Sequence, residues 1–223
     1  MKNSHPLIHL EGLGFRHTAD RPVLRGVDLR LHPGERVGLV GAIGSGKTTL
    51  LHIIVGLLKA DQGRIEVLGR TRNNERDFRE VRERVGLLFQ DPDDQLFCPT
   101  VQEDIAFGPL NQGRNREETR TAVQRALSLV GLRGFEDRVT HHLSGGEKRL
   151  VSLATVLAME PDALLLDEPE NGLDPPSHER IRSMIPSLPQ AMLIVSHNTD
   201  FLRSVATRCL RIAEGRITAS VAW

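Results

Sequence analysis

The sequence contains no tyrosine, one tryptophan and two cysteines among its 223 residues. The two cysteines, Cys98 and Cys209, lie far apart and outside any CxxC or Cys/His spacing, so nothing in their placement indicates a zinc site. We expect both to be buried, reduced thiols of a cytoplasmic protein.

Long apolar runs and an excess of charge of one sign are also absent. The longest apolar stretch, 50–58, is interrupted by His52 and Gly56. It falls short of the ~20 residues that a membrane-spanning helix needs, so we expect no membrane span. Residues 1–10 lack the apolar run of a secretory signal. Lys+Arg and Asp+Glu both number 29, a balance that argues against a general nucleic-acid-binding protein.

The patterning of the chain predicts strands and helices in alternation. Val27, Leu29 and Leu31 alternate with polar residues, as in a half-buried antiparallel strand. The other predicted elements are strands at 36–40, 65–67, 85–89, 163–166 and 192–195, paired strands within 211–219, and helices at 47–58, 75–84, 117–130 and 144–159. This order predicts an α/β fold with a mainly parallel, twisted sheet. We expect a single domain, 1–223, with a core of about 1–89 and 161–223 and a helical insertion of about 90–160.

Residues 41–48, GAIGSGKT, match the pattern G-x-x-x-x-G-K-[ST] in full and lie between a predicted strand and a predicted helix. Glycines let the backbone close around an anion, Lys47 can add a charge at the β- and γ-phosphates, and the Thr48 hydroxyl can reach Mg²⁺. A dinucleotide-binding loop is excluded because the Lys-Thr step has no role in one. The predicted triphosphate site consists of Gly41, Ala42, Ile43, Gly44, Ser45, Gly46, Lys47, Thr48 and Thr49.

A pair of acids, Asp167 and Glu168, follows the apolar strand at 163–166. Asp167 would hold Mg²⁺, directly or through water, and Glu168 would orient or deprotonate the attacking water. Paired acids at a strand end also occur as surface decoration, and the upstream phosphate loop is what favours the catalytic interpretation.

The segment 143–147, LSGGE, resembles the signature motif LSGGQ of the ABC transporter ATPases, with Glu147 in place of Gln. The resemblance implies a P-loop NTPase fold with an N-terminal antiparallel β subdomain and an inserted helical subdomain. It also implies ATP and Mg²⁺ as cofactors, with Ser144, Gly145 and Gly146 binding the γ-phosphate of ATP held by a second subunit. Such binding would be that of an anion at a helix N-terminus.

Other segments resemble further elements of this family in the expected order. Gln90 resembles the Q-loop glutamine, residues 171–174 resemble the D-loop, and His197 resembles the switch histidine, although a lone His after an apolar strand would otherwise be structural. The resemblance implies a catalytic set of Glu168, His197, Gln90 and Lys47, and Mg²⁺ ligands from Thr48, Gln90 and Asp167.

One position departs from the family pattern. The family usually stacks an aromatic residue, most often Tyr, on adenine near the N-terminus, whereas His17 falls in that place here and Phe15 lies two residues earlier. Imidazole can stack on a base with less area than a phenol ring. We therefore expect His17 at the adenine.

Residues 89–97, FQDPDDQLF, and the following 100–110 resemble the energy-coupling-factor ATPases, which drive uptake of cobalt, nickel and vitamins. In that group this stretch is the surface on which a coupling helix of a transmembrane protein docks. The resemblance assigns docking to Asp93, Asp94, Gln95, Leu96 and Phe97, with Leu96 and Phe97 expected to be exposed. The alternative is an ordinary loop packed against the helical subdomain.

These observations predict an ATP-hydrolysing motor at the cytoplasmic face of the membrane. Its expected partners are a second ATPase subunit, identical or related, a transmembrane coupling protein and a substrate-capturing membrane subunit, and no nucleic acid. The resemblance favours cobalt or nickel as cargo, and a vitamin such as biotin stays open because a separate subunit captures the cargo. The neighbours His141 and His142 are interpreted as structural.

Two other classes of protein fit the sequence less well than a transport motor does. A soluble ABC-type ATPase acting on DNA or ribosomes tends to carry a coiled-coil insertion or two cassettes, and this sequence has neither. A small P-loop kinase would need an acceptor lid and has no use for LSGGE.

Overall fold

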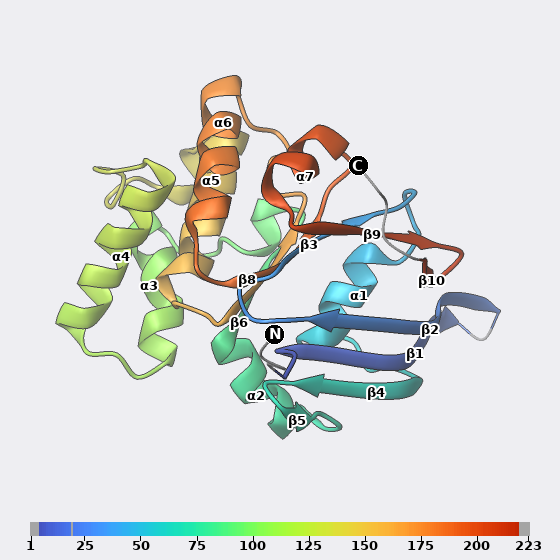
Figure 1. Cartoon of the computed structure of the whole chain (residues 1–223). Coiled ribbons are helices and arrows are strands. Elements are labelled where there is room, and N and C mark those ends of the chain that lie inside the picture. Colours follow the sequence, from blue (N-terminus) through green and yellow to red (C-terminus); the bar gives the residue numbers. More distant parts are fainter. Residues whose placement is uncertain (1–4, 19, 219–223) are drawn as a thin grey trace.

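The chain forms two sheets with helices packed around them (Figure 1), and the computed structural model describes residues 5–18 and 20–218. The strands within this part are β1 (Ile8–Thr18), β2 (Arg21–Leu31), β3 (Arg36–Val40), β4 (Gln62–Val67), β5 (Arg70–Thr71), β6 (Val85–Leu88), β7 (Ala163–Asp167), β8 (Ala191–Val195), β9 (Arg208–Ala213) and β10 (Arg216–Thr218). The helices are α1 (Lys47–Ile54), α2 (Glu75–Arg84), α3 (Val101–Asn111), α4 (Arg116–Val130), α5 (Gly145–Ala158), α6 (Pro175–Met184) and α7 (Thr199–Val205).

The larger sheet has the strand order β10-β9-β3-β8-β7-β6. All of its pairs are parallel except β10 with β9. Strand β7 is buried along its whole length: Leu164 and Leu166 belong to one core cluster, and Ala163 and Leu165 to the other. Successive side chains of a strand point to opposite faces, so a strand covered on both sides is apolar at every position. This is why the run at 163–166 shows no alternation.

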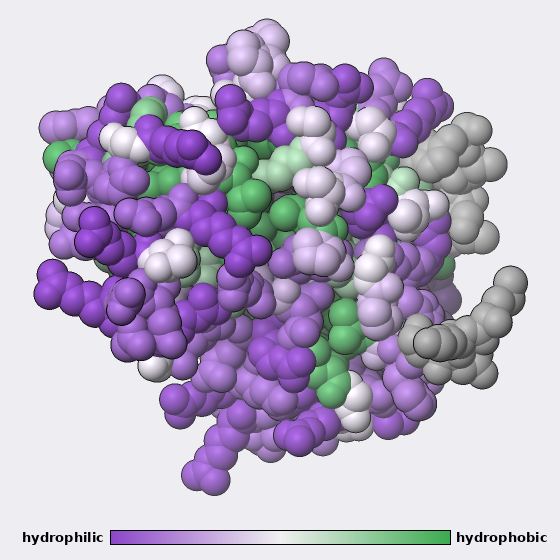
Figure 2. All heavy atoms as spheres, turned by 60° about the vertical axis from the view of Figure 1, so that its left-hand side comes forward, coloured by the Kyte–Doolittle hydropathy of each residue, from purple (hydrophilic) through white to green (hydrophobic). Residues whose placement is uncertain are grey.

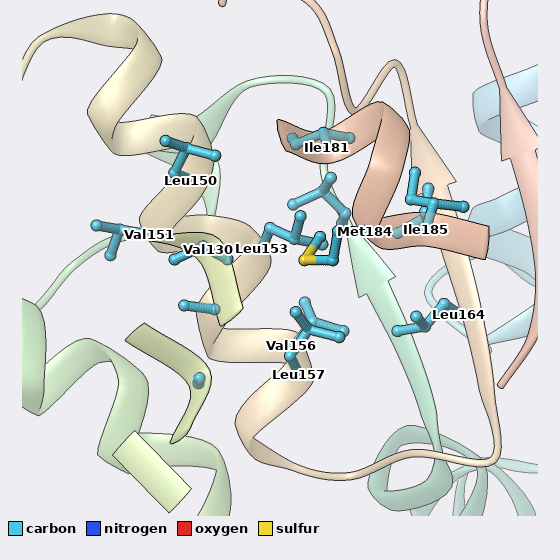
Figure 3. Close-up of a cluster of buried hydrophobic side chains, with 14 of the residues drawn as sticks. Val130, Leu150, Val151, Leu153, Val156, Leu157, Leu164, Ile181, Met184 and Ile185 are labelled. Carbon is cyan, nitrogen blue, oxygen red and sulfur yellow. The ribbon is translucent and has the colours of Figure 1, made fainter. Parts of the chain in front are cut away.

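Helices α3 to α7 contribute to the core on one face of this sheet. Figure 3 shows its centre, where Leu153 of α5 and Met184 of α6 point toward each other, with Leu164 of β7 nearby. Helix α5 is buried along most of its length, so it links the larger sheet to α3 and α4.

The smaller sheet is antiparallel, with the order β2-β1-β4-β5, and it shares the second core cluster with α1 and the other face of the larger sheet. Val27, Leu29 and Leu31 of β2 are buried, as their alternation predicted. The predicted fold class, a mainly parallel sheet with an N-terminal antiparallel sheet and a set of inserted helices, is confirmed.

Several elements differ from the predicted ones, and helices α6 and α7 and strands β1 and β5 were not predicted. Helix α1 ends at Ile54 instead of residue 58, because Gly56 takes a φ of 75° and its amide bonds back to the Ile53 carbonyl at 3.1 Å. Helix α3 was not predicted as a separate helix. Its start was readable, since Thr100 and Glu103 form a capping box in which the Glu103 carboxylate accepts from the Thr100 amide at 3.0 Å. Ala219, placed in the closing strand pair, lies outside the described residues.

The surface carries charged side chains with apolar residues between them. On the face drawn in Figure 2, apolar surface is confined to patches among hydrophilic side chains. None of the helices in the described ranges has the length and apolar character needed to cross a membrane.

Candidate functional site

Three loops that the sequence singled out meet at one edge of the larger sheet. Residues 41–48 follow β3, Asp167 and Glu168 lie at the end of β7, and His197 follows β8. Strands β3, β8 and β7 are consecutive parallel neighbours, so their carboxyl ends lie side by side. In open α/β sheets this edge is where ligands bind.

The glycines of the loop at 41–48 are required by its backbone. Gly44 and Gly46 have φ values of 75° and 100°, in the left-handed region. A Cβ on Gly46 would also lie 2.8 Å from Cδ2 of Leu24, so any side chain there would collide with β2. The loop can therefore stay close to the antiparallel sheet while α1 begins directly after it.

Lys47 lies against this loop and is nearly buried. Its Nζ donates to the carbonyl oxygens of Gly41 and Ala42, both at 2.9 Å. Burial lowers the pKa of Lys47, while the charges of Glu168 and Asp167 act in the opposite direction. The ammonium group is thus held at the loop with few competing water contacts, which strengthens its attraction for an anion.

A cavity of about 540 Å³ opens over the loop. His17, of β1, lines it together with Ala42 to Thr49, and its ring meets Phe15 edge to face at 5.0 Å. Arg21 and Arg25 of β2 and Glu214 of the β9–β10 turn also line the cavity. These three residues were not predicted from the sequence, because β2 and the β9–β10 turn come together at the loop only in the folded chain.

Thr48 and Asp167 are joined by a hydrogen bond in which the Thr48 hydroxyl donates to Oδ2 of Asp167 at 2.6 Å. Burial raises the pKa of Asp167, and the hydrogen bond from Thr48 and the charge of Arg149 oppose that shift. A hydroxyl and one carboxylate suit Mg²⁺, which usually takes one or two carboxylates, water and substrate phosphates. A cage of three or more His, Cys, Asp or Glu side chains does not occur in the described part of the chain.

Glu168 and His197 form a second pair, with Oε1 of Glu168 2.6 Å from Nε2 of His197. The Glu168 side chain is 13% exposed and that of His197 46% exposed, so the pair is open on the histidine side. Glu168 has a φ of 51°, a strained value for a residue with a side chain that costs about 1–3 kcal/mol. Its amide donates to the Val195 carbonyl at 2.9 Å, which helps to hold this backbone.

Arg149 is a further residue that the sequence analysis missed. It is 1% exposed, and its guanidinium donates to the carbonyls of Phe89, Gln90, Asp167 and Glu168, the bond to Gln90 measuring 3.2 Å. Arg149 lies in α5, five residues after Ser144. Its burial could not be recognised from the sequence, because an arginine in a helix is normally expected at the surface.

The LSGGE segment begins helix α5, with Ser144 as its N-cap. Oε2 of Glu147 accepts from the Ser144 amide at 2.8 Å, and the Glu147 amide donates to Oγ of Ser144 at 3.3 Å, which forms a capping box. The backbone hydrogen bond from Ser144 holds the pKa of Glu147 below its usual value. Arg138 pairs with the same carboxylate at 3.2 Å. Ser144 and Gly145 are exposed, so this helix terminus is accessible.

Gly41, Asp167, Glu168 and His197 do not line the cavity over the loop, and two further predicted groups lie outside it as well. Neither Gln90, which is exposed, nor the segment 144–147 lines it. The signature segment instead packs on the predicted D-loop of its own chain, since a Cβ on Gly146 would lie 3.4 Å from the Gly172 carbonyl oxygen.

The predicted docking segment is only partly exposed, and the expectation for Leu96 was wrong. Leu96 is 9% exposed and belongs to the helical core cluster. Gln95 also points inward, where its amide donates to Ser152 O at 2.8 Å and to Thr155 Oγ1 at 2.7 Å. The chain enters this part of the segment through the short 3₁₀ helix at Pro92–Asp94, and the Leu96 amide donates to the Pro92 carbonyl at 2.9 Å.

Phe97 is 66% exposed, as expected, and its ring meets Phe107 edge to face at 4.9 Å. Phe97, Phe107 and Leu57 border a groove of about 270 Å³, lined mainly by apolar residues, between α3, α5 and the end of β6. The groove thus brings exposed apolar side chains together at the surface.

The remaining expectations concern cysteine and histidine. Both cysteines are free thiols, but only Cys209 is buried, and Cys98 is half-buried, contrary to expectation. Burial, supported by Asp104, raises the pKa of Cys98 to about 11, so this thiol is unreactive at neutral pH. The rings of His141 and His142 contact each other at 4.4 Å between centroids.

The phosphate-binding loop and the acids at the strand ends define a P-loop nucleoside-triphosphate-binding protein. The family model for "ABC transporter" matches residues 24–171. The chain belongs to this family and is an ABC-type ATPase that couples ATP hydrolysis to transport.

Similar proteins support the assignment to this family. The chain is 46% identical over 217 residues to a predicted ABC transporter ATP-binding protein of Nitratidesulfovibrio vulgaris, covering 97% of this chain and 80% of that protein. It is 40% identical over 219 residues to the energy-coupling factor transporter ATP-binding protein EcfA2 of Methanospirillum hungatei, covering 96% and 55%.

Two solved structures share the fold. CbiO1 of Clostridium perfringens, described as part of the ABC transporter complex CbiONQ, has a TM-score of 0.86 and 32% identity, covering 97% of this chain and 88% of CbiO1. A bacterial ABC transporter cassette solved as a dimer has a TM-score of 0.88 and 25% identity, covering 96% and 97%.

Proposed function

We propose that this chain is the ATP-hydrolysing motor of an energy-coupling-factor importer that carries cobalt or nickel ions. The observation that carries the proposal is the meeting of the loop at 41–48 with two acid-centred pairs, Thr48 with Asp167 and Glu168 with His197. The similarity to EcfA2 and to CbiO1 supports the importer class. The cargo rests on the resemblance of residues 89–110 to the metal-transporting members of that class.

The roles of the nucleotide-binding residues follow from charge and position. Lys47 binds the β- and γ-phosphates, the loop amides from Gly41 to Thr49 surround them, and His17 stacks on the adenine. Thr48, Asp167 and Gln90 would hold Mg²⁺. When bound, the Mg²⁺ ion neutralises charge on the β- and γ-phosphate oxygens.

Hydrolysis requires a base beside the γ-phosphate. Glu168 orients the attacking water and takes its proton, and its low exposure limits competition from bulk solvent. His197 contacts the Glu168 carboxylate and, in the ATP-bound dimer, the γ-phosphate. Both residues act on the same small space because they follow neighbouring strands.

A second copy or a related subunit completes the site. Ser144, Gly145 and Gly146 of that subunit bind the γ-phosphate through the exposed helix terminus, and ATP thereby closes the two subunits head to tail. Glu147 uses its carboxylate on the Ser144 amide, and Arg138 offsets the charge that it brings near the phosphate. The groove beside Phe97 receives the coupling helix of the transmembrane protein, which places the chain at the cytoplasmic face of the membrane.

The experiment is reconstitution of this chain with the coupling and substrate-capturing subunits encoded beside it. We expect ATP-dependent uptake of radioactive cobalt or nickel into vesicles, and none when the vesicles hold the Glu168→Gln variant. Uptake of biotin instead would reassign the cargo. Failure of the chain to co-purify with any membrane subunit would refute the importer assignment.

A further inference from the structure

Ser196 and Glu170 form a buried hydrogen bond directly behind the Glu168–His197 pair. Ser196 is completely buried, and its hydroxyl donates to Oε1 of Glu170. Oγ of Ser196 also accepts from the amide of Asn198 at 2.9 Å. The bond therefore joins the loop after β7 to the turn after β8, through the fully buried Ser196 and the partly buried Glu170.

The place of this bond ties it to the proposed catalytic pair. Glu170 lies two residues after Glu168, with the buried Pro169 between them, and Ser196 directly precedes His197. Three contacts thus cross from one loop to the other in order: Glu168 N to Val195 O at 2.9 Å, Ser196 to Glu170, and Glu168 to His197 at 2.6 Å. They continue the pairing of β7 with β8 beyond the last strand residues.

Burying the carboxyl group of Glu170 costs desolvation free energy, and packing alone would not require a carboxyl group at this position. Burial raises the pKa of Glu170, and the hydrogen bond from Ser196 opposes that shift. Its second oxygen, Oε2, is buried and makes no hydrogen bond within the described part of the chain. An apolar side chain could fill the same space without this desolvation, so the hydrogen bond to Ser196 is the contact that the carboxyl group serves.

The backbone of Glu168 adds a reason for such a contact. Its φ of 51° is unfavourable and persists only where the surroundings hold it. A displacement of about 1 Å in a reacting group can lower a rate about 10²-fold.

We propose that Glu170 is a positioning residue that, through Ser196, holds His197 against Glu168 in the geometry that hydrolysis requires. The inference rests on the proposed ATPase roles of Glu168 and His197. It separates Glu170 from nucleotide binding, because Lys47 and Thr48 lie on a different loop and make no hydrogen bond with either partner.

The test measures steady-state ATP hydrolysis and calorimetric ATP binding for the purified full chain. The variants are Glu170→Ala, Ser196→Ala, the double variant, and Glu170→Gln, which keeps an oxygen that can accept from Ser196. Glu179→Ala is the matched control, because Glu179 is an exposed glutamate of α6 whose carboxylate pairs with Arg182 on its own helix. Thermal unfolding of each variant verifies that it is folded.

We expect kcat to fall about 10- to 100-fold in Glu170→Ala and Ser196→Ala, with KM and ATP affinity unchanged, because placement of the base is lost while binding is kept. The double variant should have a kcat no lower than that of the slower single variant, since each single variant already removes the Ser196–Glu170 hydrogen bond. Glu170→Gln should stay close to wild type, as should the control.

Two results would overturn the role. One is a folded Ser196→Ala or Glu170→Ala protein with wild-type kcat, and the other is a Glu170→Gln protein as slow as Glu170→Ala. A wild-type chain without ATPase activity would instead refute the proposed function itself, and this outcome is recognised by the wild type failing along with every variant.

Discussion

Glu168→Gln separates the chemical step from nucleotide binding in a single substitution. The amide has the size of the carboxylate, and its oxygen can still accept a hydrogen bond from Nε2 of His197, so the loop geometry is kept. What is lost is the proton acceptor, and a positioned general base contributes about 10²–10⁴-fold to a rate. That range corresponds to about 3–5 kcal/mol of the activation barrier.

Several features place the expected loss in the upper part of that range. Glu168 is 13% exposed and lies beside a histidine, so little solvent is available to act as a base in its place. ATP affinity should be unchanged, because Lys47 and Thr48 are untouched. With hydrolysis blocked, ATP should accumulate on the protein and hold two copies together.

The assays are phosphate release at saturating ATP, calorimetry, and size-exclusion chromatography with and without ATP. The control is Glu179→Gln on the exposed face of α6, which should match wild type in all three. Steady-state hydrolysis that is unchanged in Glu168→Gln would remove Glu168 from its role as base. Loss of ATP binding would show that the residue acts on the nucleotide instead.

Three further predictions follow from the same geometry. Lys47→Ala should raise the Kd for ATP about 10- to 150-fold, the value of a hydrogen bond to a charged group, and undiminished binding by calorimetry would contradict the phosphate assignment. Phe97→Ser should abolish uptake while sparing ATPase activity, whereas Leu96→Ala should lower the free energy of unfolding by about 2–5 kcal/mol because Leu96 is buried; equal effects of the two in chemical denaturation would refute this division. The pKa of Glu147 is lowered in the folded state, so the stability that its carboxylate adds as a cap is present above pH 4.5, the ordinary pKa, and is lost as the pH falls through the folded-state pKa. The Tm difference between wild type and Glu147→Gln should therefore shrink on acidification. A Tm difference that stays constant with pH would contradict this prediction.

Much of the fold was predictable because it depends on local patterns. The alternation in β2 and the continuous apolar run of β7 report directly which faces are covered. The loop at 41–48 was predictable because its glycines and Lys-Thr step have one chemical use. Helix α3 was missed because residues 100–110 were used only for the family resemblance, although its capping box was readable.

The parts that sequence did not reveal depend on long-range contacts. Arg149 looks like a surface charge until the fold places four carbonyl oxygens around it. Leu96 was expected to be exposed, and it is buried in the helical core cluster instead. Arg21, Arg25 and Glu214 come together at the cavity only in the fold, where the Arg25 amide donates to the Gly215 carbonyl at 2.7 Å.

Arg149 connects helix α5 to two segments at the edge of the larger sheet. The helix starts at Ser144, whose exposed end faces outward, and five residues later the Arg149 guanidinium donates to carbonyls of the segments that follow β6 and β7. Through these hydrogen bonds, a tilt of α5 would act on Gln90 and Glu168 together. A displacement that begins at one end of α5 would therefore reach both the segment after β6 and the acid after β7 through one side chain.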